Sequence, residues 1–274
     1  MSHQRPRFPA RLGAGAQGVS PAPAPVVSRK GAPSARSEVR SGPSGATRPA
    51  VPRSTGLGLD SAAVRARMVQ RLAQGGVRHP AVLAALSAVE RHRFVDTALV
   101  NQAYEDTSLP IGLGQTISKP SVVARMVELL LDAPLLAAGG RGRVLEIGTG
   151  CGYQAAVLAQ VVAEVYSIER LRALHEKARA NLRPLRLANL HLLFGDGMVG
   201  YARGAPYAGI IAAAGGDAVP PAWLEQIAVG GRLVAPCAAA DGVQNLVVME
   251  RHAGGWTRRM LEPVLFVPLK SGTA

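Results

Sequence analysis

The chain has 274 residues and a mass of 28.5 kDa, enough for one large α/β domain or two small ones. Its net charge is +13, but the excess is uneven. Residues 1–58 hold nine basic side chains and one acid, a balance of +8, whereas residues 59–274 hold 22 and 17, a balance of +5. The two cysteines, Cys151 and Cys237, exclude a disulfide-rich secreted scaffold and cannot by themselves supply a four-ligand zinc site. We therefore expect a cytoplasmic protein without a metal centre.

Residues 1–58 differ in composition from the rest of the chain. They contain nine of the 20 prolines and eight glycines with almost no aliphatic periodicity, so we expect a disordered, solvated tail. Its arginines could attract a polyanion such as RNA, although aromatic residues for base stacking are not interleaved with them. The prolines and glycines also interrupt any secretory or organelle-targeting segment. The longest uncharged run, residues 147–163, is broken by glycines, so no membrane-spanning helix is predicted.

Residues 59–140 are predicted to form helices around a polar loop. Asp60 or Ser61 can cap a first helix, whose apolar residues recur with helical spacing until a Gly-Gly pair. A second helix follows Pro80. After a polar passage punctuated by glycine and proline, a third helix begins near Ser121.

Residues 141–274 alternate between short apolar strands and helices. We expect strands at 144–147, 164–168, 190–194, 208–213, 232–236, 245–250 and 264–269, and helices at 153–162, 171–182 and 221–227. Strands separated by helices of this length require right-handed crossovers, which predicts a doubly wound, mostly parallel α/β sheet. The last two strands flank the Gly254-Gly255 turn and are expected to close the sheet as an antiparallel pair.

A glycine-rich turn follows the first of these strands. Gly148, Gly150 and Gly152 let the backbone turn sharply and let a ligand lie against main-chain atoms. Ligands of open α/β sheets bind beyond the carboxyl ends of the strands. Glu169 ends the next strand, 21 positions after Gly148, where a carboxylate can accept hydrogen bonds from both hydroxyls of a ribose. The alternative is that the glycines are turn residues only and that Glu169 caps a helix or forms a surface ion pair.

Two features favour S-adenosylmethionine over a dinucleotide. The G-x-G-x-G spacing differs from the G-x-G-x-x-G of pyrophosphate sites, and Glu146 would repel a diphosphate but suits the cationic methionine end of S-adenosylmethionine. After the third strand, Asp196 could accept a hydrogen bond from the adenine amino group. The expected cofactor-binding residues are Glu146, Gly148, Thr149, Gly150, Gly152, Glu169, Asp196 and Gly197.

The sequence resembles the protein-L-isoaspartate O-methyltransferase family over residues 66–269. Segments that carry the resemblance include Val89–Val95, Leu109–Ser118 with its GQTIS sequence, the EIGTGCGYQAAVLA run from Glu146 to Ala159, Ser167–Arg170, Gly195–Gly197 and Phe266–Leu269. The GQTIS sequence is distinctive for this family, whereas the glycine motif is shared by many methyltransferases. The resemblance implies a Rossmann-like methyltransferase fold with S-adenosylmethionine as cofactor.

The resemblance also implies a reaction, which is methyl transfer to the free α-carboxylate of L-isoaspartyl residues in damaged proteins and peptides. By the same resemblance, Ser118 contacts the substrate carboxylate, while Thr116 and Ile117 shape the loop; the alternative is that Ser118 only caps the helix near Pro120. A carboxylate is already an anion at pH 7, so the attack requires no general base. We expect a monomer with isoaspartyl proteins as substrates, no membrane partner, and nucleic-acid binding only through the tail.

The chain departs from the family pattern at several positions. Lys119 and Ser121 stand where the family has glutamine and an aromatic residue, and Gly215-Gly216 falls within a changed segment after the fourth strand. Ala208 stands where the family has aspartate, a loss that could loosen the substrate-side wall. Two alternatives follow: a methyltransferase of another substrate, such as a small acid or RNA, and a degenerate domain with a nucleic-acid-binding tail.

Overall fold

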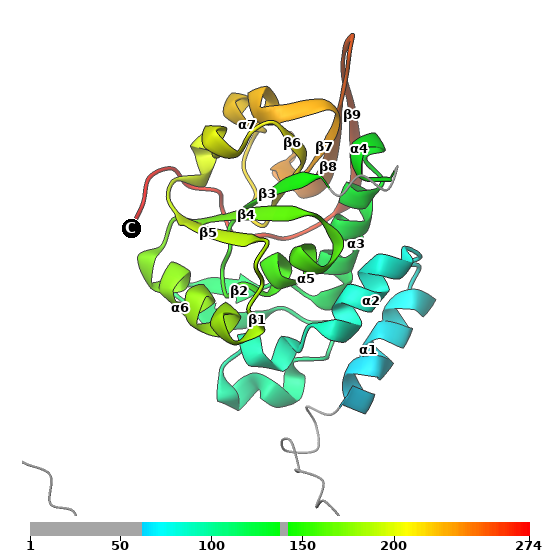
Figure 1. The fold of residues 1–274 in the computed structure, drawn as a ribbon, viewed down its shortest axis with the longest axis vertical. Coiled ribbons are helices and arrows are strands. Elements are labelled where there is room, and N and C mark those ends of the chain that lie inside the picture. The colour runs from blue at the N-terminus through cyan, green and yellow to red at the C-terminus, as the bar shows by residue number, and fades with distance from the viewer. Residues whose placement is uncertain (1–61, 138–141) are drawn as a thin grey trace, which may run out of the picture. The chain divides into compact units, whose positions relative to one another are not determined.

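The computed structural model describes residues 62–137 and 142–274; the expected tail at 1–58 and the caps Asp60 and Ser61 lie outside these ranges. In the described part, seven strands form one mixed sheet in the order β5-β4-β3-β6-β7-β8-β9 (Figure 1). The first five strands in that order are parallel, and β8 and β9 are each antiparallel to the strand before them. The seven strands are β3 (Arg143–Ile147), β4 (Glu164–Glu169), β5 (Leu190–Phe194), β6 (Tyr207–Ala212), β7 (Ile227–Ala238), β8 (Gln244–His252) and β9 (Gly255–Pro263). The expected mostly parallel α/β fold with an antiparallel C-terminal strand pair is confirmed.

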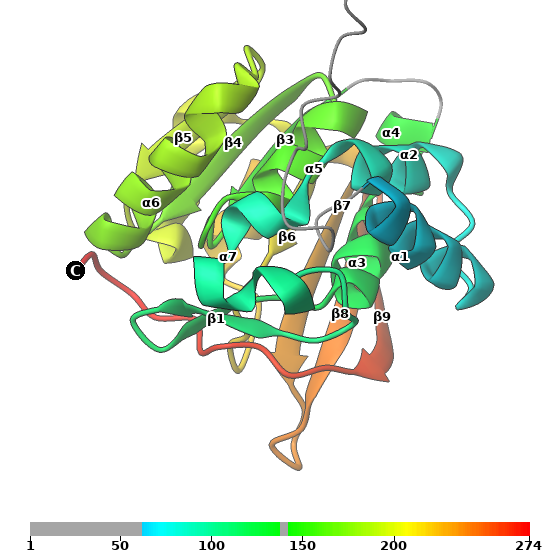
Figure 2. The same ribbon diagram turned by 90° about the horizontal axis from the view of Figure 1, so that it is seen from below.

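Helices pack on both faces of the sheet. On one face lie α3 (Pro120–Leu131), α5 (Tyr153–Val161) and α6 (Arg172–Leu182), with α1 (Ala62–Gln74) and α2 (Pro80–Ala88) beside them (Figure 2). On the opposite face lies α7 (Pro221–Gln226), whose Trp223 is buried. Gly209 on β6 allows α3 to approach closely, because a Cβ there would lie 2.7 Å from Leu130.

The polar passage before α3 holds more regular structure than its sequence predicts. Two 3₁₀ segments, Arg91–Phe94 and Thr97–Gln102, lead into an antiparallel hairpin of β1 (Leu109–Gly112) and β2 (Gln115–Ile117). The hairpin is anchored by buried apolar side chains, and it leads directly to the N-terminus of α3. The remaining short helices are α4 (Pro134–Ala137) and the 3₁₀ turns Arg183–Leu185, Gly197–Val199 and Ala202–Gly204.

The antiparallel partner of β8 is not the expected segment 264–269. Instead β9 follows the turn immediately and pairs with β8, while Gly215 and Pro268 form an isolated parallel bridge. Nearly all of β9 is exposed at the sheet edge, so its sequence is charged and lacks the apolar alternation of a half-buried strand. The apolar segment 264–269 runs instead along the carboxyl ends of the parallel strands, where it lines the cavities described below.

None of the helices in the described ranges is both long enough and apolar enough to cross a membrane.

Candidate functional site

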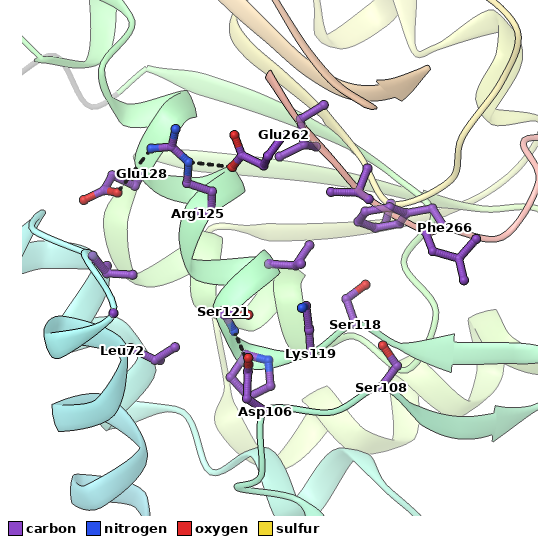
Figure 3. Close-up of a pocket in the computed structure, with 18 of the residues that line it drawn as sticks. Leu72, Asp106, Ser108, Ser118, Lys119, Ser121, Arg125, Glu128, Glu262 and Phe266 are labelled. Atoms are coloured by element: carbon purple, nitrogen blue, oxygen red, sulfur yellow. Dashed lines mark hydrogen bonds and ion pairs between the residues drawn. The ribbon is translucent and has the colours of Figure 1, made fainter. Parts of the chain in front are cut away.

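Two cavities adjoin at the carboxyl ends of the parallel strands. The smaller, about 470 Å³, lies by β3, the central strand at which the order of parallel strands reverses and where open α/β sheets bind ligands. The larger, about 810 Å³, lies between α1, the N-terminal turn of α3 and the end of β9 with the residues that follow it (Figure 3). Four residues line both cavities: Thr116, Ser118, Ala213 and Val267. We call these four residues the junction.

The glycine loop after β3 forms one wall of the smaller cavity. Gly148, Gly150 and Gly152 have φ angles of +89°, +57° and +93°, a backbone region that other residues rarely adopt. Gly148, Thr149 and Gly150 line the cavity, whereas Gly152 is the N-cap residue of α5 and packs against α6 instead. The loop therefore places main-chain atoms of Gly148 and Gly150 on the cavity wall.

Glu169 presents a fixed carboxylate at the same cavity. It ends β4, is 5% exposed, and lines the cavity wall. Its Oε2 accepts a hydrogen bond from Gly150 N at 2.8 Å, and its Oε1 accepts one from Leu171 N at 2.9 Å. Because each carboxylate oxygen can accept more than one hydrogen bond, both retain capacity for a ligand hydroxyl. Glu169 thus holds the glycine loop in place and remains an acceptor at the cavity.

Glu146 lies beneath the glycine loop rather than on the cavity wall. It is fully buried, and Ser167 Oγ donates a hydrogen bond to its Oε2 at 2.5 Å. Ser167 Oγ in turn lies 2.6 Å from Thr149 Oγ1, so a polar chain links Glu146 to the loop. Burial raises the pKa of Glu146 to about 8, and its Oε1 has no hydrogen-bond partner within the described ranges. The carboxyl is therefore largely protonated at pH 7.

Asp196, the expected adenine partner, is engaged by the chain itself. Its Oδ1 accepts a hydrogen bond from Met198 N at 2.8 Å and caps the short helix after β5. Its Oδ2 accepts one from Gly272 N at 2.6 Å, which ties the C-terminal segment to this strand end. Gly197 lines the smaller cavity, whereas Asp196 does not.

The GQTIS segment forms the boundary between the two cavities. Ile117 is 4% exposed and lines the smaller cavity only, whereas Thr116 and Ser118 belong to the junction. The N-cap position of α3 is Lys119, with no side-chain cap hydrogen bond. Within the described part of the chain, Ser118 Oγ makes no hydrogen bond. The geometry thus shows no capping role for Ser118 and leaves its hydroxyl available at the junction.

Comparison with known proteins identifies the family of the chain. A family model described as protein-L-isoaspartate(D-aspartate) O-methyltransferase matches residues 63–274. The chain belongs to this family. Among its relatives, a protein-L-isoaspartate O-methyltransferase from Methylibium petroleiphilum is 65% identical over 220 residues, which cover 80% of this chain and 81% of the relative. The resemblance noted from the sequence is confirmed.

Two solved structures also resemble this chain. A protein-L-isoaspartate O-methyltransferase is 28% identical with a TM-score of 0.67, covering 76% of this chain and 66% of that one. A Plasmodium falciparum protein solved in complex with S-adenosyl-L-homocysteine is 21% identical with a TM-score of 0.64, covering 75% of this chain and 98% of that one. The similarity to this second structure is a similarity of fold.

The C-terminal wall of the site is a feature of this family member that sequence reasoning missed. Residues 262–270 line the larger cavity, the smaller cavity or both. The side chain of Gln244 holds this segment, because its Oε1 accepts from Phe266 N at 2.8 Å and its Nε2 donates to Phe266 O at 3.2 Å. Gly215 leaves room for that amide, since a Cβ there would lie 2.7 Å from Gln244 Nε2. The sequence signal for this wall is the segment Phe266–Leu269, which carries part of the family resemblance, but its apolar residues predict a strand.

Arg91 is a further feature near the site that the sequence analysis does not predict. It is fully buried, and its Nε donates to the carbonyl oxygen of Ala103 at 2.8 Å. Its guanidinium lies over the ring of Tyr153, 4.8 Å from the ring centroid, and burial lowers its pKa. Because Tyr153 lines the smaller cavity, Arg91 connects that cavity to the segment that precedes the hairpin.

Two of the departures from the family pattern lie on cavity walls. Lys119 and Ser121 line the larger cavity. Ala208 is buried in β6 and lines neither cavity, so its lost carboxylate does not belong to the substrate-side wall.

Proposed function

We propose that this chain is a protein-repair enzyme that transfers a methyl group from S-adenosylmethionine to the free α-carboxylate of L-isoaspartyl residues in proteins and peptides. The observation that carries the proposal is the position of Ser118. It lies where a cavity edged by a glycine loop and Glu169 meets a larger cavity able to admit a peptide. Family membership supports the same reaction.

The reaction needs positioning more than acid–base chemistry. S-adenosylmethionine supplies a methyl group already activated by its sulfonium centre. An α-carboxyl group has an ordinary pKa near 3.5, so the substrate is ionised at pH 7 and needs no general base. The composition of the junction is consistent with a reaction that needs no general base, because none of its four residues is titratable. The chain's task is to hold one carboxylate oxygen in line with the methyl group, so that the new O–C bond can form as the S–C bond of the donor breaks and S-adenosylhomocysteine leaves.

The smaller cavity fits the cofactor. Glu169 is a buried carboxylate at the end of the second parallel strand along the chain, and we assign to it the two ribose hydroxyls. Gly148, Thr149 and Gly150 offer main-chain atoms to the rest of the molecule. Glu146 supports Thr149 from below through Ser167. If Asp196 accepts a hydrogen bond from the adenine amino group, it must do so beside the bond that its Oδ2 already accepts from the main chain of the C-terminal segment.

Ser118 is the residue we assign to the substrate carboxylate, through a hydrogen bond from its hydroxyl. Thr116 lies beside it at the junction, and buried Ile117 fixes the strand between them. The product is a methyl ester, which is a better acyl donor than a carboxylate. The adjacent main-chain nitrogen then closes a succinimide with loss of methanol, and hydrolysis of that ring partly restores aspartate.

We extend the proposal to the organisation of the chain. Residues 59–274 form the methyltransferase domain, with residues 59–140 carrying the helices and the substrate loop and residues 141–274 the cofactor-binding sheet. Residues 1–58 form a separate tail, and any nucleic-acid binding resides there. The proposed enzyme is monomeric and cytoplasmic, the latter favoured by two buried cysteines that are both free. Size-exclusion chromatography with light scattering tests the monomer, and cell fractionation tests the location.

A tritiated-methyl transfer assay tests the reaction. It compares an isoaspartyl peptide with its aspartyl twin, which differs only in the linkage at one residue. Methylation of the first and not of the second is expected. Equal labelling of both peptides, or of neither, would refute the assignment. Labelling of RNA or of a small acid instead would favour the alternative methyltransferase, and salt-dependent RNA retention without any methylation would favour a degenerate domain.

A further inference from the structure

Lys119 is a cation on the wall of the larger cavity. It follows Ser118 directly, is exposed, and lines the larger cavity but not the smaller one. Figure 3 shows its side chain in the cavity near Ser118 and Ser121. Across residues 62–137 and 142–274, its ammonium group has no hydrogen-bond or ion-pair partner.

The other charged groups on this wall are already engaged. Arg125 Nε donates to Glu262 Oε1 at 2.8 Å, and Glu128 Oε1 accepts two main-chain N–H groups at 2.7 and 2.8 Å. Asp106 Oδ1 accepts a main-chain N–H at 2.8 Å, and Arg71 Nη2 donates to a main-chain carbonyl at 2.8 Å. Lys119 therefore differs from its neighbours in having all three of its donors available to a ligand.

We infer that Lys119 gives the enzyme a preference for isoaspartyl residues that have an acidic residue one or two positions away. This inference rests on the proposed function. With the isoaspartyl carboxylate at Ser118, the rest of the peptide must extend into the larger cavity, because the smaller one holds the cofactor. A peptide spans at most about 3.3–3.6 Å per residue, so a side chain one or two residues away lies within reach of the Lys119 ammonium group. A carboxylate there forms an ion pair, whereas a neutral or cationic side chain does not.

The size of the preference follows from the exposure of Lys119. Exposed ion pairs contribute about 0.2–1 kcal/mol, so kcat/KM for an acidic peptide should exceed that of its neutral twin by about 1.4- to fivefold. The Debye length falls from about 10 Å at 0.1 M salt to about 3 Å at 1 M. The preference should therefore shrink toward unity at high salt.

The experiment uses paired isoaspartyl peptides with Glu or Gln at each of the two positions on either side of the isoaspartyl residue. For each pair, the ratio of kcat/KM for the Glu peptide to that for the Gln peptide is measured with the full chain. We expect at least one position to give a ratio of about 1.4 or more for the wild type. Lys119→Gln should bring that ratio to about one, Lys119→Glu should bring it below one, and Lys119→Arg should preserve it.

A matched control separates a local contact from net charge. Arg259→Gln removes the same charge from an exposed residue of β9 that lines neither cavity, and should leave the ratio as in the wild type. A ratio near one at every position in the wild type would overturn the inference, as would an undiminished ratio in Lys119→Gln. An equal fall in Arg259→Gln would do the same. If the wild type methylates none of the isoaspartyl peptides, including the neutral ones, the proposed function itself is refuted, and not only the assignment to Lys119.

Discussion

Replacing Ser118 by alanine should leave the fold intact and impair catalysis. In the described structure, the hydroxyl makes no hydrogen bond to the protein and does not cap α3. Its removal should therefore change the free energy of unfolding by less than about 0.5 kcal/mol, whereas loss of a helix cap typically costs about 1 kcal/mol. The same hydroxyl, as a donor to the substrate carboxylate, should contribute about 1.5–3 kcal/mol to the transition state. The expected loss is roughly 10- to 150-fold in kcat/KM for the isoaspartyl peptide.

Three measurements separate these effects. Urea denaturation reports stability, calorimetry reports S-adenosylmethionine affinity, and methyl transfer to the isoaspartyl peptide reports kcat/KM. Ser108→Ala serves as the control, because Ser108 lines the larger cavity but lies outside the junction (Figure 3). Only Ser118→Ala should lower kcat/KM strongly, with cofactor affinity nearly unchanged. Wild-type kinetics in a folded Ser118→Ala variant would contradict the substrate assignment.

Three further changes test the surroundings of the junction. Glu169→Ala should weaken S-adenosylmethionine binding by about 1.5–3 kcal/mol in calorimetry, because it removes the ribose acceptor and the partner of Gly150 N. Glu146 has a folded-state pKa raised from 4.5 to about 8, so its protonated form stabilises the fold below about pH 4.5 and this stability is lost as pH rises toward 8. Glu146→Gln should therefore gain stability relative to the wild type between pH 5 and pH 9, by on the order of 5 kcal/mol at most, as thermal unfolding without cofactor would show. Gly215→Ala should cost about 1–3 kcal/mol in urea denaturation by displacing Gln244, and the penalty should shrink in a Gln244→Ala background.

The meeting of the glycine loop and Glu169 at one cavity could be predicted because it depends on local signals. Buried strands appear as short apolar runs, glycines end the first of them, and Glu169 ends the second. The carboxyl ends of parallel strands share one edge, so these residues had to meet there. Sequence position does not give side-chain direction. Glu146 comes two residues before Gly148 but is buried and lies outside the cavity wall, and Asp196 accepts a hydrogen bond from Gly272, 76 residues away.

The substrate-binding half was harder to predict because its elements are short or depend on distant partners. The two hairpin strands have only four and three residues, too few for an alternating apolar pattern to stand out. The first of them also contains Pro110. The segment 264–269 is apolar like a strand, but it joins the fold without a strand ladder, through one isolated bridge, a main-chain hydrogen bond from Val264 N to Gln244 O at 2.8 Å and the side chain of Gln244. The charged sequence of β9 conceals a strand, because an edge strand with both faces exposed needs no apolar alternation.

The chemistry of the reaction explains why the site has this form. The substrate brings an ionised nucleophile and the cofactor brings an activated methyl group, so a titratable side chain at the junction would add only a competing nucleophile or a charge to neutralise. Short polar and apolar residues suffice there, provided that they are held rigidly. The hairpin holds Thr116 through its strand pairing, and the side chain of Gln244 holds the segment that carries Val267. Charge can then serve selectivity further from the reacting atoms, which is where the structure places Lys119.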